Sequence, residues 1–118
     1  MNAGQRSRVS RSGHRHARRT KPPPPPQGAL ERAAALFRAV GDVGRLRLLH
    51  QLGDSEWCVS ELAERAGVKL STLSQQLRIL HGQRIVDRRR DGKHVYYRLA
   101  DEHVRAMVHA AIDHAAHG

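Results

Sequence analysis

Cysteine is almost absent from this chain, which has a single one, Cys58, among its 118 residues. One cysteine excludes an intramolecular disulfide and any Cys–Cys metal or redox pair within one chain, and it fits a reducing cytoplasm. No apolar stretch reaches about 18 residues, so we expect neither a membrane span nor a secretory signal. The sequence also lacks an HExxH motif and a recognisable set of nucleophile, base and orienting residue. It therefore predicts a cytoplasmic protein that is not an enzyme and takes no small-molecule substrate.

Acidic residues are missing from the first 21 positions, which carry seven of the 21 basic residues. The five prolines of Pro22–Pro26 follow and are expected to form a stiff polyproline spacer about 15 Å long. We therefore predict a disordered basic arm over residues 1–27 and one small domain over residues 28–118. The domain keeps 14 basic and 11 acidic residues, a net charge of +3 out of the +10 of the whole chain. The basic excess favours a polyanionic partner.

Apolar residues recur at helical spacing in three segments before residue 67. We predict helices at Ala29–Val40, Val43–Leu52 and Val59–Ala66, each followed by a glycine. Their apolar faces comprise Leu30, Ala33, Ala34, Phe37 and Val40 in the first, Leu46, Leu49 and Leu52 in the second, and Val59, Leu62 and Ala63 in the third. Because the folded part has only about 90 residues, a buried dimer seam would help to stabilise it.

A fourth helix is predicted at Ser71–His81, a few residues after the third. The apolar face here comprises Leu70, Leu73, Leu77 and Leu80. Two short helices across a glycine-containing turn are typical of a helix-turn-helix, whose second helix reads DNA. The polar side chains of this helix are of the types that reach base edges or phosphates. The candidate DNA contacts are Lys69, Ser71, Thr72, Ser74, Gln75, Gln76 and Arg78.

Residues 84–99, RIVDRRRDGKHVYYRL, contain two strand-like runs around Asp91-Gly92, a dipeptide typical of a tight hairpin. In the second run we expect Val95, Tyr97 and Leu99 to pack and the alternate residues to face water. A basic tip can be merely solvated, but directly after a helix-turn-helix it favours a wing that contacts DNA. The candidate contacts on this wing are Arg88, Arg90, Lys93 and His94.

Four potential metal ligands lie in the last eighteen residues, in the patterns Asp101-x-His103 and His114-x-x-His117. On a helix the three imidazoles share one stripe, because His114 lies roughly 20° and His117 roughly 40° from His103 around the axis. His103 and His114 are about 16 Å apart along that axis, too far to hold one ion within one chain. Positions 103, 107, 110, 114 and 117 have the spacing of a seam between two helices.

If the last helix pairs antiparallel with its own copy, Asp101 and His103 of one chain come beside His114 and His117 of the other, and symmetry gives two sites. Three nitrogens and one carboxylate oxygen suit tetrahedral zinc, with cobalt as a look-alike, and leave no position for a catalytic water. Asp101 then lies at the helix entrance, where Asp is a common N-cap. Alternatively, some of the nine histidines fall at this spacing by chance. We expect His109, which is off the stripe, to be solvated.

Four motifs, SEWCVSELAERAGV, STLSQQLRIL, DGKHVYYRL and DEHVRAMVHAAIDHAAH, carry a resemblance to a known family. Residues 29–117 resemble the ArsR/SmtB family of metal-responsive repressors, and the last helix resembles the zinc and cobalt sensors of the SmtB/CzrA type. The resemblance implies a mainly α fold with a small β-hairpin, a winged helix-turn-helix that is dimeric through its first and last helices. It implies a homodimer that binds double-stranded operator DNA when metal-free. Zinc or cobalt, held by the residues that match Asp101, His103, His114 and His117, then releases the DNA and derepresses metal efflux or storage genes.

The chain departs from the family pattern at three points. Gln75 stands where many members have His, and Val43-Gly44 replaces a frequent Pro-Thr. The family's thiolate box at the third helix keeps only Cys58, which argues against a sensor of arsenic, cadmium or lead. Some relatives build a second metal site from this cysteine and the N-terminal arm, and here it would comprise Cys58, Glu61, His14 and His16. Otherwise the arm is only a tail, and Cys58 is a small residue at a helix entrance.

A second class of function stays open, namely a winged-helix regulator of the same fold that responds to a non-metal signal or holds a purely structural metal. Operator binding that zinc leaves unaltered would point to that class. Nickel is less expected, because six-coordinate relatives draw further ligands from a C-terminal extension and this chain stops at Gly118. The operator sequence, the regulated genes, the choice between zinc and cobalt and the role of the arm are all left open.

Overall fold

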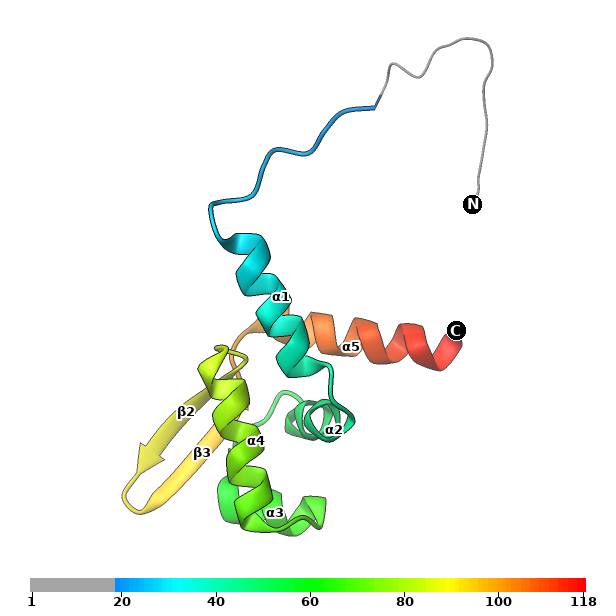
Figure 1. Cartoon of the computed structure of the whole chain (residues 1–118). Helices are drawn as coiled ribbons and strands as arrows, with labels where there is room; N and C mark the ends of the chain where they lie inside the picture. Colours follow the sequence, from blue (N-terminus) through cyan, green and yellow to red (C-terminus); the bar gives the residue numbers. More distant parts are fainter. Residues whose placement is uncertain (1–18) are drawn as a thin grey trace.

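A computed structural model describes residues 19–118 of the chain. Within this part the elements run α1 (Ala29–Val40), α2 (Val43–Leu52), β1 (Trp57–Cys58), α3 (Val59–Ala66), α4 (Leu70–Gly82), β2 (Val86–Asp91), β3 (His94–Leu99) and α5 (Glu102–His117) (Figure 1). Residues 19–26 belong to neither helix nor strand and are exposed. None of the described helices is both long and apolar enough to cross a membrane. The predicted fold class, mainly helical with a basic hairpin after the helix-turn-helix, is confirmed.

A single apolar core joins the helices to the base of the hairpin. Its fully buried large side chains are Leu49, Leu52, Leu62, Leu73, Leu77, Leu80, Ile85 and Val86. Each such burial contributes about 1.5–3 kcal/mol relative to exposure, which is the main stabilising term for a domain of this size. Leu70, which the sequence pattern grouped with the apolar face of α4, is 53% exposed because it is the first residue of that helix.

Capping residues set the start of α2 and the turn between α3 and α4, the two helices of the helix-turn-helix. Helix α2 begins at the N-cap Asp42, whose carboxylate accepts a hydrogen bond from the backbone N–H of Arg45 at 3.0 Å. Helix α3 ends at Gly67, whose φ of 68° is left-handed and whose N–H donates to the carbonyls of Ala63 and Glu64. A residue with a Cβ is strained in that conformation, so glycine ends the helix here and lets α4 begin three residues later.

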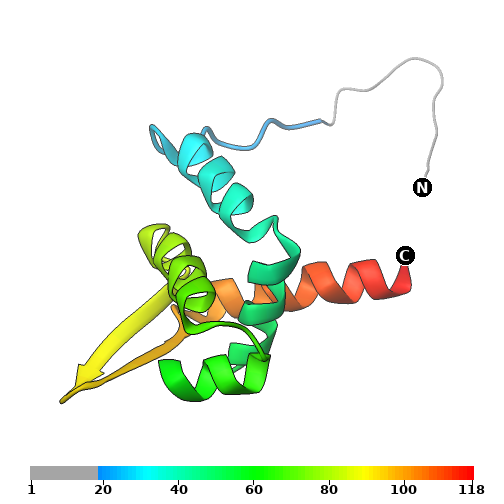
Figure 2. The same cartoon turned by 60° about the horizontal axis from the view of Figure 1, so that its bottom comes forward.

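The hairpin is part of a three-stranded antiparallel sheet with the strand order β1-β3-β2. The sequence predicted only β2 and β3, because a two-residue strand such as Trp57–Cys58 has no alternation to detect. The β2–β3 ladder runs from Val86↔Leu99 to Asp91↔His94, and the turn uses Gly92, whose φ is 64°. This wing projects from the body of the protein in both Figure 1 and Figure 2.

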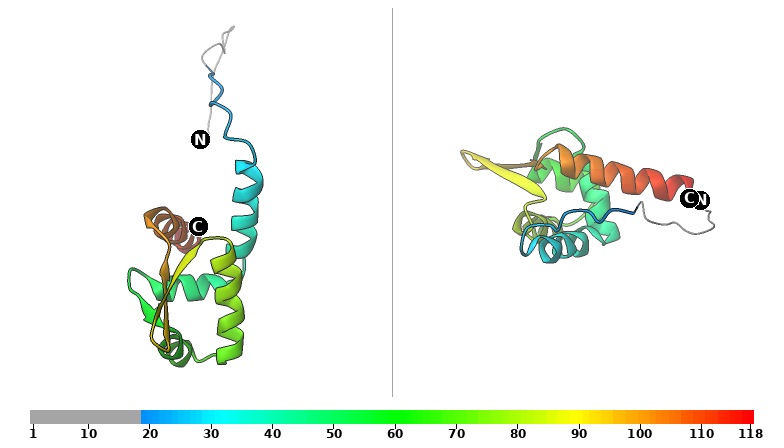
Figure 3. Two further views of the ribbon diagram at one scale, coloured as in Figure 1. Left: turned by 90° about the vertical axis from the view of Figure 1, so that its left-hand side faces the viewer. Right: turned by 90° about the horizontal axis from the view of Figure 1, so that it is seen from above.

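The last helix reaches away from the wing. Helix α5 packs on α2 and on β3, and its buried residues are Val104 and Val108. Its C-terminal end and the tip of the wing lie at opposite ends of the molecule, as Figures 1 and 2 and the right-hand view of Figure 3 agree. Helix α5 therefore connects its remote C-terminal end both to α2 and to β3 of the wing.

Candidate DNA interface and metal site

The polar face of α4 is presented to solvent as predicted. Its buried residues are Leu73, Leu77 and Leu80, and most of its other positions are exposed. Of the seven predicted DNA contacts here, the exposed ones are Lys69, Ser71, Thr72, Gln75 and Arg78, and the half-buried ones are Ser74 and Gln76. A helix that offers such side chains to solvent can enter the major groove of DNA.

The two adjacent glutamines of α4 differ in direction. Gln75 is exposed, whereas Gln76 is half-buried with its amide turned towards the start of α2. A Cβ added at Gly44 would lie only 2.7 Å from Nε2 of Gln76 and 3.2 Å from a carboxylate oxygen of Asp42. A side chain at position 44 would thus require the terminal amide of Gln76 to turn away. Gln75 is the freer of the two to reach a base edge.

The wing presents arginines on two faces. Successive residues of a strand point to opposite sides, so Arg88 and Arg90 share one face of β2 and Arg89 lies on the other. The guanidinium of Arg89 donates to both carboxylate oxygens of Glu56, at 2.8 and 3.0 Å, and lowers the pKa of that carboxyl. Arg88, Arg90, Lys93 and His94, the predicted wing contacts, are exposed.

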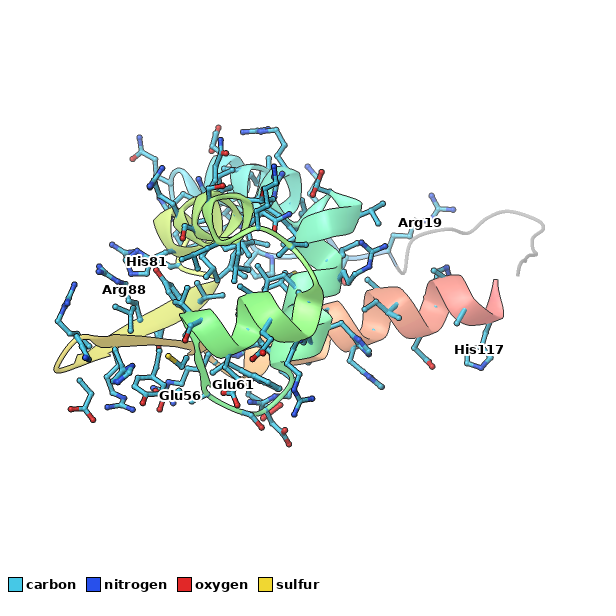
Figure 4. The ribbon with its side chains drawn as sticks, turned by 90° about the horizontal axis from the view of Figure 1, so that it is seen from below. Arg19, Glu56, Glu61, His81, Arg88 and His117 are labelled. Carbon is cyan, nitrogen blue, oxygen red and sulfur yellow. The ribbon has the colours of Figure 1, made fainter. Side chains whose placement is uncertain are left out.

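A groove of about 480 Å³ separates the wing from α3 and α4. Its walls include five predicted DNA contacts, Ser74, Arg78, Arg88, Lys93 and His94, and also Cys58. In Figure 4 the side chains of His81 and Arg88, which also line this groove, lie close to each other beside the wing. The helix-turn-helix and the wing thus share one groove, to which both contribute basic side chains.

Cys58 is half-buried at the entrance of α3. Its Sγ lies 3.5 Å from Oγ of Ser60 and 3.9 Å from Nδ1 of His94. Hydrogen bonds from Ser60, then from His94 and the backbone of Glu61, lower the pKa of the thiol to about 7, against the opposing effect of burial. Of the other residues predicted for a second metal site, Glu61 is exposed, while His14 and His16 lie outside the described residues.

Asp101 and His103 lie together at the start of α5. Asp101 is the N-cap, as predicted, and its Oδ1 accepts a hydrogen bond from the backbone N–H of Val104 at 2.9 Å. The same oxygen lies 3.8 Å from Nδ1 of His103, whose side chain is 98% exposed. Both side chains are accessible to a group from outside the chain.

His114 and His117 line a shallow hollow at the other end of α5 with Ala110, Asp113 and Gly118. Nδ1 of His117 lies 2.8 Å from the backbone carbonyl oxygen of Asp113 and 3.4 Å from its Oδ1. The sequence reasoning did not single out Asp113, although its i, i+4 spacing to His117 could have revealed it. Among residues 19–118, no three potential ligands of one chain gather into a metal-binding group.

One face of α1 remains uncovered. Leu30 and Phe37 are 68% and 61% exposed, and Ala33 and Ala34 between them are exposed as well. These four belong to the predicted apolar face of the helix, whose fifth residue, Val40, is buried in the core. Together they form an apolar stripe that a partner could bury.

The fold and these surfaces are those of a winged helix-turn-helix DNA-binding protein. Residues 42–88 match the family described as bacterial regulatory protein, arsR family. The transcriptional repressor SmtB homolog of Synechocystis is 45% identical over 71% of this chain, which spans 64% of that protein. The HTH-type transcriptional regulator KmtR of Mycobacterium tuberculosis is 40% identical over 81% of this chain and 74% of its own length. This chain belongs to the ArsR family of transcriptional regulators.

Two further comparisons bear on ligand and assembly. The cadmium resistance regulatory protein CadC homolog of Staphylococcus aureus is 37% identical and covers 69% of this chain, which spans 68% of that protein. A winged helix-turn-helix domain of Mycobacterium bovis, described as homodimeric and as a possible ArsR-family regulator, aligns with a TM-score of 0.68. It is 30% identical and covers 81% of this chain and 90% of its own. These relatives are regulators, so the chain is a DNA-binding regulator and not an enzyme.

Proposed function

We propose that this chain is a metal-responsive repressor that binds operator DNA as a metal-free homodimer and releases it when zinc or cobalt binds. The DNA-binding part of the proposal is supported by the exposed face of α4 and by the basic groove beside the wing. The metal part is supported by the ligand pattern on α5 and by a relative named for cadmium resistance. Release of the operator would allow transcription of genes for metal efflux or storage.

The observation that carries the proposal is the direction of the ligand stripe. Helix α5 uses Val104 and Val108 to pack on its own core. At about 100° per residue, the three histidines of the stripe lie roughly 80° to 140° around the axis from Val104, off the face that packs. All three are exposed. Met107, which has the same spacing, is half-buried against the core, whereas the histidines and Ala110 are exposed. This exposed part of the stripe favours a second copy of α5 as its partner.

A symmetric pair would complete the ligand sets that one chain leaves incomplete. Asp101 and His103 of one copy would join His114 and His117 of the other, and the second site would follow by symmetry. If the Nδ1–H of His117 donates to the Asp113 carbonyl, its Nε2 is left free as the ligand atom. Zinc held by four protein ligands would have no reactive position, so its role here would be to clamp the two helices together. The exposed stripe on α1 would extend the same interface.

Metal binding can release DNA only if the metal prefers the dimer conformation that binds DNA poorly. Clamping two α5 helices fixes their crossing and hence the separation of the two α4 helices, since α5 packs on α2 and α2 on α4. These recognition helices must match half-sites about one DNA turn apart, roughly 34 Å. Linkage then requires operator DNA to weaken zinc binding by the same factor.

The test is to measure the zinc affinity of the free dimer and of the dimer saturated with operator DNA, using a competing chelator. We expect DNA to weaken zinc binding at least about fivefold, the lower range of allosteric coupling. Equal zinc affinities would contradict the sensor function. They would leave a winged-helix regulator with a structural metal or a non-metal signal.

A pair of variants separates the sensor site from the DNA site. The double variant His114→Ala/His117→Ala should lose zinc-dependent release while its metal-free operator affinity stays nearly unchanged, because the C-terminal end of α5 and the wing lie at opposite ends of the molecule, as His117 and Arg88 do in Figure 4. His109→Ala is the matched control, because His109 is exposed on the same helix but off the stripe. If the double variant loses operator binding without metal, the histidines serve the structure and not the signal.

A further inference from the structure

One arginine of the wing is held by the body of the protein. The guanidinium of Arg89 donates from Nε and from Nη2 to the two carboxylate oxygens of Glu56. Its Cζ also lies 4.6 Å from the centroid of the Tyr96 ring on β3. A two-bond contact between planar groups fixes the direction of the guanidinium as well as its distance, and the ring fixes the plane beneath it. Arg89 therefore has one defined orientation.

Glu56 belongs to the body and not to the hairpin. It precedes β1 directly, and its neighbour Trp57 is anchored twice. The indole N–H of Trp57 donates to the carbonyl of Leu52 at the end of α2, at 3.2 Å, and Cζ of Arg65 on α3 lies 5.3 Å from the ring centroid. Since the strand order is β1-β3-β2, the contact from Glu56 to Arg89 crosses β3 and joins the two outer edges of the sheet.

The base of this wing packs on the helices, β2 on α4 and β3 on α2, α3 and α5, and His94 near its turn lies 3.9 Å from Cys58, but side-chain and strand links to its middle are few. Strand β1 pairs with β3 at only two positions, and β2 has no partner other than β3 in the described sheet. A two-stranded hairpin by itself is marginally stable and twists easily, so its outer half needs a support from outside. Arg89 lies midway along β2, between the buried base at Val86 and the turn, where such a support acts.

We infer that the Glu56–Arg89 contact sets the position of the wing for operator binding, so that Glu56 and Arg89 are positioning residues that need not touch DNA. The inference rests on the proposed contacts of Arg90 and Lys93 with DNA. Arg90 is the next residue along β2 and points to the opposite face, so a rotation at Arg89 moves Arg90 and the turn with it.

The charge of Glu56 and its proposed positioning role predict opposite effects of the same substitution on operator affinity. Glu56→Gln removes one acid, and if only charge mattered it would strengthen binding to a polyanion. If Glu56 positions the wing, the same change weakens operator binding. Asp87→Asn is the matched control, because it also removes one acid, and the ion pair it breaks, with Arg98 at 3.5 Å, lies within the hairpin itself.

The experiment measures operator affinity of the metal-free protein by fluorescence anisotropy at fixed salt. We expect Glu56→Gln to weaken binding roughly threefold to tenfold, a typical size for coupled neighbours, while Asp87→Asn leaves it unchanged or tightens it. Arg89→Lys keeps the charge but cannot make the paired contact, and it should weaken binding as well. Both residues of the pair are partly exposed, so the urea midpoint should stay near that of the wild type.

Exchanging the charges of Glu56 and Arg89 tests the contact itself, because operator binding would not recover in the double variant if the two residues only served stability. Glu56→Arg and Arg89→Glu should each weaken operator binding, and the double variant, which has the wild-type net charge, should recover most of it. Glu56→Gln behaving like Asp87→Asn, or a double variant no better than the single ones, would overturn the inference. The double variant Arg90→Ala/Lys93→Ala distinguishes the two proposals: unchanged operator affinity there would instead overturn the proposed contact of the wing with DNA.

Discussion

The Oδ1 atom of Asp101 accepts the backbone N–H of Val104 at 2.9 Å and lies 3.8 Å from Nδ1 of His103. One carboxylate thus caps α5 and stands beside a proposed metal ligand. Asparagine caps helices about as well as aspartate but brings no charge to a cation. We therefore expect Asp101→Asn to keep the unfolding free energy and to weaken zinc binding. Urea denaturation and a chelator competition measure the two effects.

The alanine variant at the same position is the control for the capping role. Asp101→Ala should weaken zinc binding and also lower the unfolding free energy by about 1 kcal/mol, because the N–H of Val104 loses its acceptor. Zinc affinity unchanged in both variants would mean that Asp101 is only a cap, and that the metal has a different fourth ligand.

The unequal directions of Gln75 and Gln76 lead to a prediction about base reading. Gln75→Ala should change the preference for one operator base pair by roughly 1–3 kcal/mol, because the exposed amide can make a paired hydrogen bond to adenine. Gln76→Ala should leave base preference nearly unchanged, since its amide faces Gly44. Binding to a set of operators that each carry one substitution measures both. A shift in preference from Gln76→Ala alone would reverse the two roles.

The helices were the most predictable part of this fold. Their period and their glycines gave the bounds of α1, α2 and α3 to the residue, and those of α4 to within one residue at each end. The N-cap role of Asp101 was also predictable, because a cap is a local interaction between residues three apart. Local rules suffice where the stabilising partners are close in sequence.

What the sequence did not reveal depends on contacts between distant residues. Glu56 and Arg89 are 33 positions apart, and Cys58 and His94 are 36 apart, so no periodicity brings them together. The same is true of Gln76 and Gly44, whose proximity follows from the crossing of α2 and α4. The four proposed metal ligands were chosen by spacing, and their meeting in a dimer remains a prediction.

The exposed stripe on α1 predicts how the dimer can be weakened. Phe37→Ala should raise the dimer dissociation constant by a factor equivalent to about 2 kcal/mol or more, the typical loss for an aromatic anchor at an interface. Arg38→Ala, a truncation of the next, exposed residue, should have little effect. Sedimentation equilibrium of the metal-free protein measures the constants. An unchanged constant in Phe37→Ala would place the interface elsewhere.

The environment of Cys58 predicts an unusually acidic thiol. Only the thiolate reacts with an alkylating agent, and the folded state lowers the pKa of Cys58 to about 7. The rate of alkylation by iodoacetamide should therefore fall to half of its plateau near pH 7 in the folded protein, and near the ordinary value of about 8.5 in the urea-unfolded chain. The hydrogen bond from Ser60 is the largest cause of the shift. Ser60→Ala should accordingly move the folded midpoint upwards, and His94→Ala should move it less. A folded midpoint that coincides with the unfolded one would mean that neither Ser60 nor His94 stabilises the thiolate in solution.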